Sequence, residues 1–250
     1  IADVFLPPFY KGGQPKEAQF MAIGLEDGAV GVSYILLPDE IMEEYTALQA
    51  PDFIGKDPQE FAFNFGSDNP VKEMISLAAI NAICQHVMRE THFDAGSAHD
   101  SMGLLSVSSQ DTIGMVGLFS GLVKKIEKAG AELIVLEKND ELIKEYPDLP
   151  ITLDVTKLRA CNKVLCTSTT IMNNSLDEIL DHCSADAFVS IIGPTAGYFP
   201  DPVFARGVDV LGGRIVKNGE LFFQRLVEKK RWGDSTQKVL FRKETYAGII

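Results

Sequence analysis

The chain has 250 residues, of which 46% are hydrophobic, and its 35 acidic and 23 basic residues give a formal net charge of −12 at pH 7. This length and apolar content suffice for one large or two modest folded units, and they exclude disorder for the chain as a whole. The negative charge argues against nucleic acid or an anionic membrane as the main partner, so we expect a small-molecule ligand.

The sequence shows no signal for export or membrane insertion. No apolar run approaches the ~20 residues of a membrane helix, and the first residues lack the basic start and long apolar run of a signal peptide. Four cysteines without a Cys-x-x-Cys pair are typical of reduced, mostly buried thiols. We therefore expect a cytoplasmic protein without a membrane partner, and we leave homo-oligomer formation open.

The first third of the chain reads as a small α+β unit. Residues 17–37 predict two strands around a hairpin turn at Glu26-Asp27-Gly28. Residues 71–90 predict a helix, because their apolar positions recur at helical spacing behind the start signal Asp68-Asn69-Pro70. Strands followed by a helix favour a separate small domain, which we assign to residues 1–95.

After Asp111 the pattern changes to strands that alternate with helices. Apolar strands are predicted over 112–117, 131–138, 164–169, 187–194, 208–216 and 238–246, with helices over 120–130, 175–183, 201–207 and 218–231. Ser175 and Glu178 are predicted to form a capping box, and Asp201 to cap the helix that it begins. This alternation predicts a Rossmann-like, mostly parallel sheet with helices on both faces over residues 96–250.

A glycine-rich turn follows the first strand of this second unit. Gly117 permits a tight turn, Phe119 to Leu122 supply amides at the start of the next helix, and Ser120 can cap that helix or bind a ligand. Glu137 ends the next strand, twenty positions after Gly117, where dinucleotide and S-adenosylmethionine binders place an acid on the ribose hydroxyls. The glycine spacing departs from the dinucleotide fingerprint, so we disfavour an NAD site. We favour a ligand loop over a tight turn with a surface glutamate.

Two further strand ends carry polar or glycine-rich segments. Thr167, Ser168, Thr169 and Thr170 follow one strand, with Asn173 and Asn174 before the next helix, which is more than capping needs. Gly193-Pro194-Thr195-Ala196-Gly197 follows another. Each segment alone also fits an ordinary hydrogen-bonded turn or a rigid connection. Because all three lie at strand ends of one sheet, together they predict a polar pocket.

Asn81 lies on an otherwise apolar face of the predicted helix over 71–90. A buried amide must find hydrogen-bond partners. It could reach across the domain junction into the pocket, or it could be a structural amide that ties the helix to a neighbouring backbone.

Metal ligands and an acyl-transfer triad are not indicated. His86, His92, His99 and His182 are scattered, and no His or Cys pair has the spacing of a zinc site. We therefore predict no metal-ligand cluster in the protein, and leave the identity of any cofactor unknown. G-x-S-x-G is absent as well.

The segments "MVGLFSGLVKKIEKAGAELIVLEKN", "TSTTIMNNSLDEIL", "IIGPTAGYFPDPVFARGVDVLGG" and "LAAINAI" resemble those of a prokaryotic family named "putative heavy-metal chelation". The resemblance covers nearly the whole chain. It implies an enolase-N-terminal-like domain followed by a Rossmann-like domain with a cleft between them, and a context of metal uptake or of corrinoid, flavin, pterin or siderophore-like chelator metabolism. The site residues that it implies are Asn81, Gly117, Phe119, Ser120, Glu137, Thr169, Thr170, Asn173, Asn174, Pro194 and Thr195.

Our leading hypothesis is an enzyme-like protein that binds a small polar heterocyclic or metal-chelating molecule in this cleft. Glu137 would bind hydroxyl groups or act as a general base, Asn81 would close the site, and the amides of 117–121 would hold an anionic group. The expected reaction is condensation or hydrolysis. Two alternatives remain: a non-catalytic protein that binds a metal or a metal complex, and an S-adenosylmethionine-dependent methyltransferase.

Overall fold

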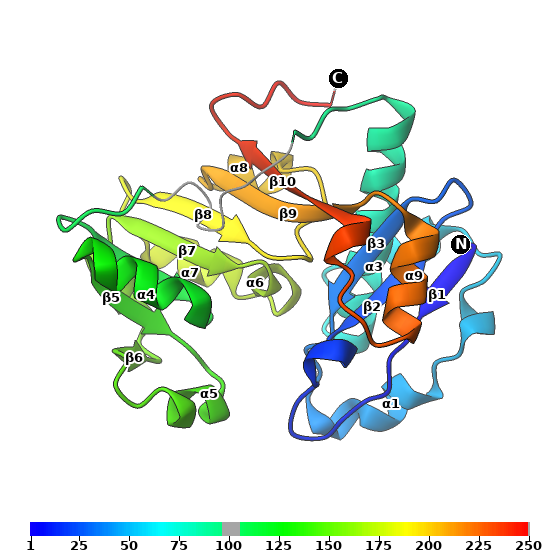
Figure 1. Ribbon diagram of the computed structural model, residues 1–250, viewed down its shortest axis with the longest axis horizontal. Coiled ribbons are helices and arrows are strands. Elements are labelled where there is room, and N and C mark those ends of the chain that lie inside the picture. The colour runs from blue at the N-terminus through cyan, green and yellow to red at the C-terminus, as the bar shows by residue number, and fades with distance from the viewer. Residues whose placement is uncertain (97–105, 250) are drawn as a thin grey trace.

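The computed structural model describes residues 1–96 and 106–249 and shows an α/β fold with two sheets (Figure 1). A three-stranded antiparallel sheet is built from the N-terminal part, and a seven-stranded, mostly parallel sheet from the rest. The predicted fold class is confirmed. Among the described residues, no helix combines the length and apolarity needed to cross a membrane.

The small sheet consists of β1 (Asp3–Phe5), β2 (Phe20–Gly24) and β3 (Val30–Tyr34) in the order β1-β2-β3. The predicted hairpin between β2 and β3 is confirmed, and Gly28 in its turn has a φ of +82°, a conformation that favours glycine. Strand β1 is not predicted, because three residues are too few to show the alternation of apolar and polar side chains that is typical of a strand. The short helices α1 (Met42–Ala47) and α2 (Pro58–Ala62) follow the hairpin.

Helix α3 (Pro70–Glu90) joins the two sheets. Its start agrees with the prediction, since the Asn69 side chain accepts a hydrogen bond from the backbone N–H of Lys72. Its backbone packs so closely on β3 that a Cβ atom at Gly31 would lie 1.9 Å from the carbonyl oxygen of Ala78. Leu77 of the same helix belongs to the hydrophobic core of the large sheet, so α3 is buried on two sides.

The large sheet has the order β10-β9-β8-β7-β4-β5-β6, and only β10 is antiparallel to its neighbour. The chain starts in the middle at β4, runs to β6, and returns to β7 on the other side of β4. The carboxyl ends of β4 and β7 therefore form the point where the strand order reverses, which is the usual ligand position of open parallel sheets. The strands are β4 (Thr112–Val116), β5 (Glu132–Leu136), β6 (Ile151–Thr152), β7 (Lys163–Thr167), β8 (Phe188–Ile192), β9 (Val210–Val216) and β10 (Thr236–Arg242).

Helices cover both faces of this sheet, as predicted. On one face, Leu122, Val123 and Ile126 of α4 pack against β4, β5 and β7, and on the other, Leu176 and Ile179 of α7 join the larger core. The helices that follow β4 along the chain are α4 (Ser120–Ala129), α5 (Asp140–Glu145), α6 (Thr169–Met172), α7 (Leu176–His182), α8 (Asp201–Ala205) and α9 (Gly219–Val227), and the last of these packs elsewhere. Short 3-10 turns lie at Lys16–Ala18, Asp39–Ile41, Ala50–Asp52, Val155–Ala160 and Gly233–Ser235.

Two predicted caps are wrong. Ser175 precedes α7 but its side chain accepts no hydrogen bond from the helix amides, and its hydroxyl donates to Asn173 Oδ1 at 2.6 Å. Asp201 is the first residue of α8 and not its cap, and its carboxylate accepts a hydrogen bond from the Tyr246 hydroxyl at 2.7 Å.

Helix α9 belongs by sequence to the large-sheet part but packs on the small sheet, where Phe222 and Leu226 contact Ala22, Val30 and Val32 (Figure 1). The two parts therefore share a hydrophobic core through α9 as well as through α3. A division near residue 95 remains a prediction; the segment 91–103 in which the boundary was placed falls partly outside the described residues.

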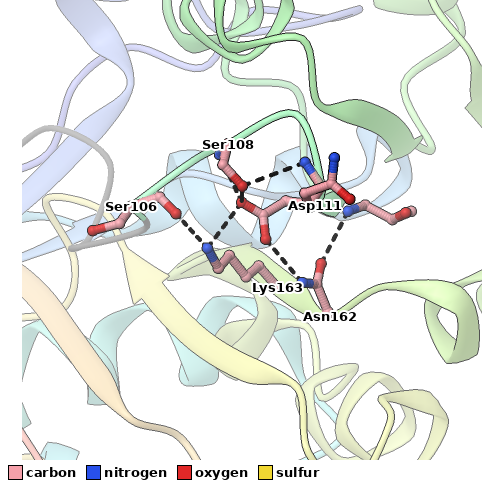
Figure 2. A network of polar contacts seen from close by, with 7 residues as sticks. Ser106, Ser108, Asp111, Asn162 and Lys163 are labelled. Atoms are coloured by element: carbon pink, nitrogen blue, oxygen red, sulfur yellow. Dashed lines mark hydrogen bonds and ion pairs between the residues drawn. The ribbon is translucent and has the colours of Figure 1, made fainter.

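A buried carboxylate fixes the amino ends of β4 and β7, at the edge of the sheet opposite their carboxyl ends (Figure 2). Asp111 is 6% exposed, and its oxygens accept from Ser108 N and Oγ, Asn162 Nδ2 and Lys163 Nζ at 2.6, 2.9, 2.8 and 3.0 Å. Lys163 also donates to the Ser106 carbonyl. Burial raises the pKa of Asp111, but the hydrogen bonds outweigh burial and hold that pKa well below its usual range.

Candidate functional site

A cleft of about 670 Å³ lies at the carboxyl edge of the large sheet, between this sheet and the N-terminal part. It is lined by the loops that follow β4, β5, β7 and β8, and by residues of the small sheet. Residues that follow the paired strands β4 and β7 line it, and at these strands the order of the sheet reverses, which is where open parallel sheets usually bind ligands. Its volume falls in the range of small-molecule sites.

Most residues that the sequence indicated come together in this cleft. The loops after four different strands bring them there although they are far apart along the chain. They are Gly117, Phe119, Glu137, Thr169, Thr170, Asn173, Pro194 and Thr195.

Three indicated residues are not among those that line it. Ser120 is the exposed first residue of α4, and it does not cap the helix. Asn174 is exposed and has a φ of +54°, a left-handed conformation that asparagine tolerates in turns. Asn81 is buried beneath the cleft. Whether any of these residues contacts a ligand stays a prediction.

The glycine loop is tight, and three of the five amides over 117–121 have acceptors within the protein. Gly117 has a φ of +79°, and a Cβ atom there would lie 2.8 Å from Cγ2 of Thr167 at the end of β7. The amide of Gly117 donates to the Leu136 carbonyl at 2.8 Å, that of Leu118 to Glu137 Oε2 at 2.9 Å, and that of Phe119 to Met115 Sδ at 3.3 Å. These three N–H groups are therefore directed at protein atoms and not at the cleft, in contrast to the anion-binding role expected of them.

Glu137 is fixed by its own backbone surroundings. Oε2 accepts from Leu118 N, and Oε1 accepts from Asn139 N at 2.8 Å, so the carboxylate bridges the loops after β4 and β5. Each carboxylate oxygen can still accept a further hydrogen bond. The side chain is half-buried and lines the cleft, so it presents a fixed acceptor to a ligand.

The cleft is lined by a group of hydroxyl-bearing residues that we call its floor: Thr167, Ser168, Thr169, Thr170 and Thr195. Ser168 and Thr195, each 1% exposed, share a hydrogen bond of 2.6 Å between their hydroxyls. The hydroxyls of Thr167 and Thr169 lie 3.1 Å apart, and Thr170 Oγ1 donates to the Thr167 carbonyl at 2.8 Å. These contacts fix the positions of the hydroxyl oxygens before any ligand arrives, which favours tight binding.

Asn81 connects the two parts of the molecule below this floor. Its Nδ2 donates to the carbonyl of Val32 in β3 at 2.8 Å and to that of Thr195 at 2.9 Å, and the residue is 2% exposed. These two contacts fit a structural amide, whereas its buried Oδ1 has no partner among the described residues, so a role in the site stays a prediction. Asn81 thus positions Thr195, which in turn fixes Ser168.

The wall from the small sheet was missed by sequence analysis. Phe20, Tyr34 and Leu36 line the cleft, and the rings of Phe20 and Tyr34 meet edge to face with centroids 5.4 Å apart. Leu36 is 43% exposed, and Leu153 on the opposite side is 70% exposed, so the cleft has apolar rims on both sides. Apolar and aromatic residues in or next to a strand are usually part of the hydrophobic core, so the sequence alone does not mark these three as ligand-binding. They line the cleft because the small sheet lies beside the large one.

The described residues offer no protein cage for a metal ion: none of their His, Cys, Asp and Glu side chains form a group of three or more that could hold one. His99 lies outside the described residues. The cysteines are free, and burial raises the pKa of the Cys161 and Cys183 thiols to about 11. Protonated buried thiols are poor metal ligands.

Comparison with known proteins adds the family. The profile of a protein family described as "Putative heavy-metal chelation" matches residues 100–243, and a second profile with the same description matches residues 18–84. The chain belongs to this family. A solved structure from Pyrococcus horikoshii belongs to the family whose profile matches residues 100–243, and its function is unknown. It is 22% identical to this chain with a TM-score of 0.69, and the similarity covers 89% of this chain and 88% of that one.

A second solved member, from Desulfitobacterium hafniense and also of unknown function, has 20% identity and a TM-score of 0.64 over 90% of this chain and 87% of its own. At these identities the similarity shows the fold. An uncharacterised protein of Methanocaldococcus jannaschii is 26% identical over 149 residues, which are 59% of this chain and 56% of that protein. The chain thus matches little more than half of that relative.

Proposed function

We propose that the chain is an enzyme-like protein that binds a small, polar, heterocyclic or metal-chelating molecule in the cleft. The observation that carries this proposal is the cleft itself: it lies at the carboxyl ends of β4 and β7, where the strand order reverses, and aromatic and hydroxyl-bearing side chains line it. A flat ring would contact the apolar walls, while its polar edge would meet the floor.

Roles for the lining residues follow from their contacts. Glu137 offers carboxylate oxygens in a fixed position, and Thr169 and Asn173 offer polar groups at the start and end of α6. Ser168 and Thr195 hold the loops after β7 and β8 together. In a condensation or hydrolysis, Glu137 is the lining carboxylate that we assign as general base.

The family description concerns chelation of heavy metals, and the cleft suits this role when the metal arrives within a small chelating molecule. The described residues contain no cluster that could ligate the ion directly. A hydroxyl-rich floor and aromatic walls would instead bind the organic part of such a molecule. Proposed members of this ligand class are siderophore-like chelators, corrinoids, flavins and pterins.

Thermal-shift measurements with a panel of these molecules, with and without bound metal, test the proposal. At least one compound should raise the melting temperature of the wild type, and Thr169→Val should lose most of that shift because it removes a hydroxyl at the cleft. Thr245→Val, at an exposed position near the C-terminus, is the matched control. An equal shift in both variants would contradict binding at this cleft.

One alternative is favoured by a specific observation. The reversal of strand order at β4 and β7 and an acidic residue directly after β5 also occur in S-adenosylmethionine sites. The occupied amides of the glycine loop weigh against it. Calorimetry with S-adenosylmethionine and S-adenosylhomocysteine at millimolar concentration tests this alternative. If neither compound gives a binding signal, the methyltransferase function is excluded.

A further inference from the structure

We propose that the cleft selects an uncharged heterocycle that donates a hydrogen bond to Glu137 and accepts one from Tyr34, and that it discriminates against phosphorylated forms of the same ring. This inference rests on the proposed function and narrows its ligand class. Three independent features support it: the charge of the lining, the state of the glycine-loop amides, and the position of Tyr34.

The lining is poor in positive charge. Among the described residues that line the cleft, Glu137 and Glu178 are acidic, Lys138 is basic, and none is arginine. Lys138 is exposed, so solvent screens its charge. Phosphate sites normally combine basic side chains with free backbone N–H groups. A phosphate group in this cleft would be repelled by the charges of Glu137 and Glu178, with Lys138 as the basic lining residue to offset them.

The backbone amides of the glycine-loop residues that line the cleft do not compensate for this lack of basic side chains. In a phosphate-binding turn after the first strand, the loop amides point at the ligand. Here Gly117, Leu118 and Phe119 each donate to an acceptor within the protein, and the acceptor for Leu118 is Glu137 itself. The carboxylate thus occupies an amide that a phosphate would require. The same arrangement makes Glu137 a pre-positioned acceptor for a ligand N–H or O–H.

Tyr34 supplies the complementary donor. It ends β3, lines the cleft from the side of the small sheet, and packs its ring against Phe20. Among the described residues, none forms a hydrogen bond with its hydroxyl. Burial, together with the nearby charge of Glu137, raises the pKa of Tyr34, so the phenol stays protonated and can donate. The site is therefore incomplete without the N-terminal part of the chain.

A ring that satisfies both groups needs a donor and an acceptor on its edge and an apolar face for the aromatic wall. Lactam rings, in which an N–H adjoins a C=O, meet this requirement, and pterins, flavins and oxopurines contain them. Matched pairs with and without phosphate are available for this class, and they allow a direct comparison.

Calorimetric titration with riboflavin against flavin mononucleotide, and with guanosine against guanosine monophosphate, tests the inference. In at least one pair the uncharged member should bind tenfold or more tightly than the phosphorylated member. Tyr34→Phe, which keeps the ring, should weaken the uncharged ligand about three- to tenfold, the loss of one neutral hydrogen bond. Glu137→Gln should reduce the ratio of affinities between the uncharged and the phosphorylated ligand, because it removes the negative charge. Lys138→Ala should leave this ratio unchanged. Circular dichroism of each variant controls for folding.

Equal or tighter binding of the phosphorylated members would overturn this inference and leave the proposed function standing. If Tyr34→Phe binds the uncharged ligand as tightly as the wild type does, the inference is overturned in the same way. If neither member of either pair binds at millimolar concentration while a chelator from the thermal-shift panel does, the inference also falls and the proposed function survives. If nothing in the panel or the pairs binds, both fall.

Discussion

Substitution of Asp111 by Asn should destabilise the fold without changing the cleft. The side chain is 6% exposed and accepts four hydrogen bonds, one of them from the ammonium of Lys163. The Asn side chain has nearly the same shape as Asp, but its NH2 group replaces one acceptor oxygen and would face some of these N–H and O–H donors. The substitution also removes the negative charge that pairs with Lys163. Removing one partner of a buried ion pair costs about 3 kcal/mol of unfolding free energy. For a chain of this size that corresponds to a drop of roughly 6–12 °C in melting temperature.

The pH dependence of this effect has a definite sign. The pKa of Asp111 is held below its value in the unfolded chain, about 3.9 for an unperturbed Asp. The stabilisation is therefore fully present above that value and is lost as the pH falls toward the folded-state pKa. Because Asn does not titrate, the difference in stability between the wild type and Asp111→Asn should be constant from pH 8 to about 5 and should shrink below about pH 4.

Urea unfolding at neutral and acidic pH measures this difference, with Asp148→Asn at an exposed position as the control. The network lies at the amino ends of β4 and β7, away from the cleft, so ligand affinity of the folded variant should match the wild type. An Asp111→Asn protein as stable as the Asp148→Asn control would refute the role assigned to the network.

Three further outcomes are expected. Gly31→Ala should lose about 3 kcal/mol or more, or fail to fold, because the new Cβ would meet the backbone of α3, whereas Gly121→Ala, with open space around it, should be neutral or stabilising by about 0.5 kcal/mol; thermal unfolding of both variants tests the pair. Asn81→Ala should lose about 2–3 kcal/mol in urea unfolding because two buried carbonyls lose their donor, and equal stability would show that the amide is not structural. Cys161, which is buried and has a pKa of about 11, should resist a thiol-reactive disulfide reagent at pH 8 until denaturant is added, and rapid labelling of this thiol in the native protein would contradict its burial.

Much of the fold could be predicted because its signals are local. Alternating apolar strands and capped helices, such as the helix that begins behind Asn69 and the one that Gly130 ends, are visible in the sequence. Strands β1 and β6 are too short to show a period, and the segment that forms α6 reads as a polar loop. The packing of α9 on the small sheet depends on long-range contacts that no local pattern encodes.

Some residues of the candidate site could likewise be predicted from local sequence signals, whereas others depend on long-range contacts. Gly117, Glu137 and Thr169 could be placed together because they follow strands of one parallel sheet, whose carboxyl ends share an edge. Tyr34 could not, since its contribution depends on how the small sheet lies against the large one. The hydrogen bonds of Glu137 to the glycine loop were equally hidden, because they result from backbone directions in two loops.

The most direct test of the ligand cleft is mass spectrometry of small molecules released from untagged protein that is purified from its native host. The wild type should carry a heterocyclic or chelating compound in near-stoichiometric amount, and Thr169→Phe, which fills the cleft, should lose it while Thr245→Phe retains it. The same compounds in wild type and Thr169→Phe, or none in either protein, would contradict a ligand site between the two sheets.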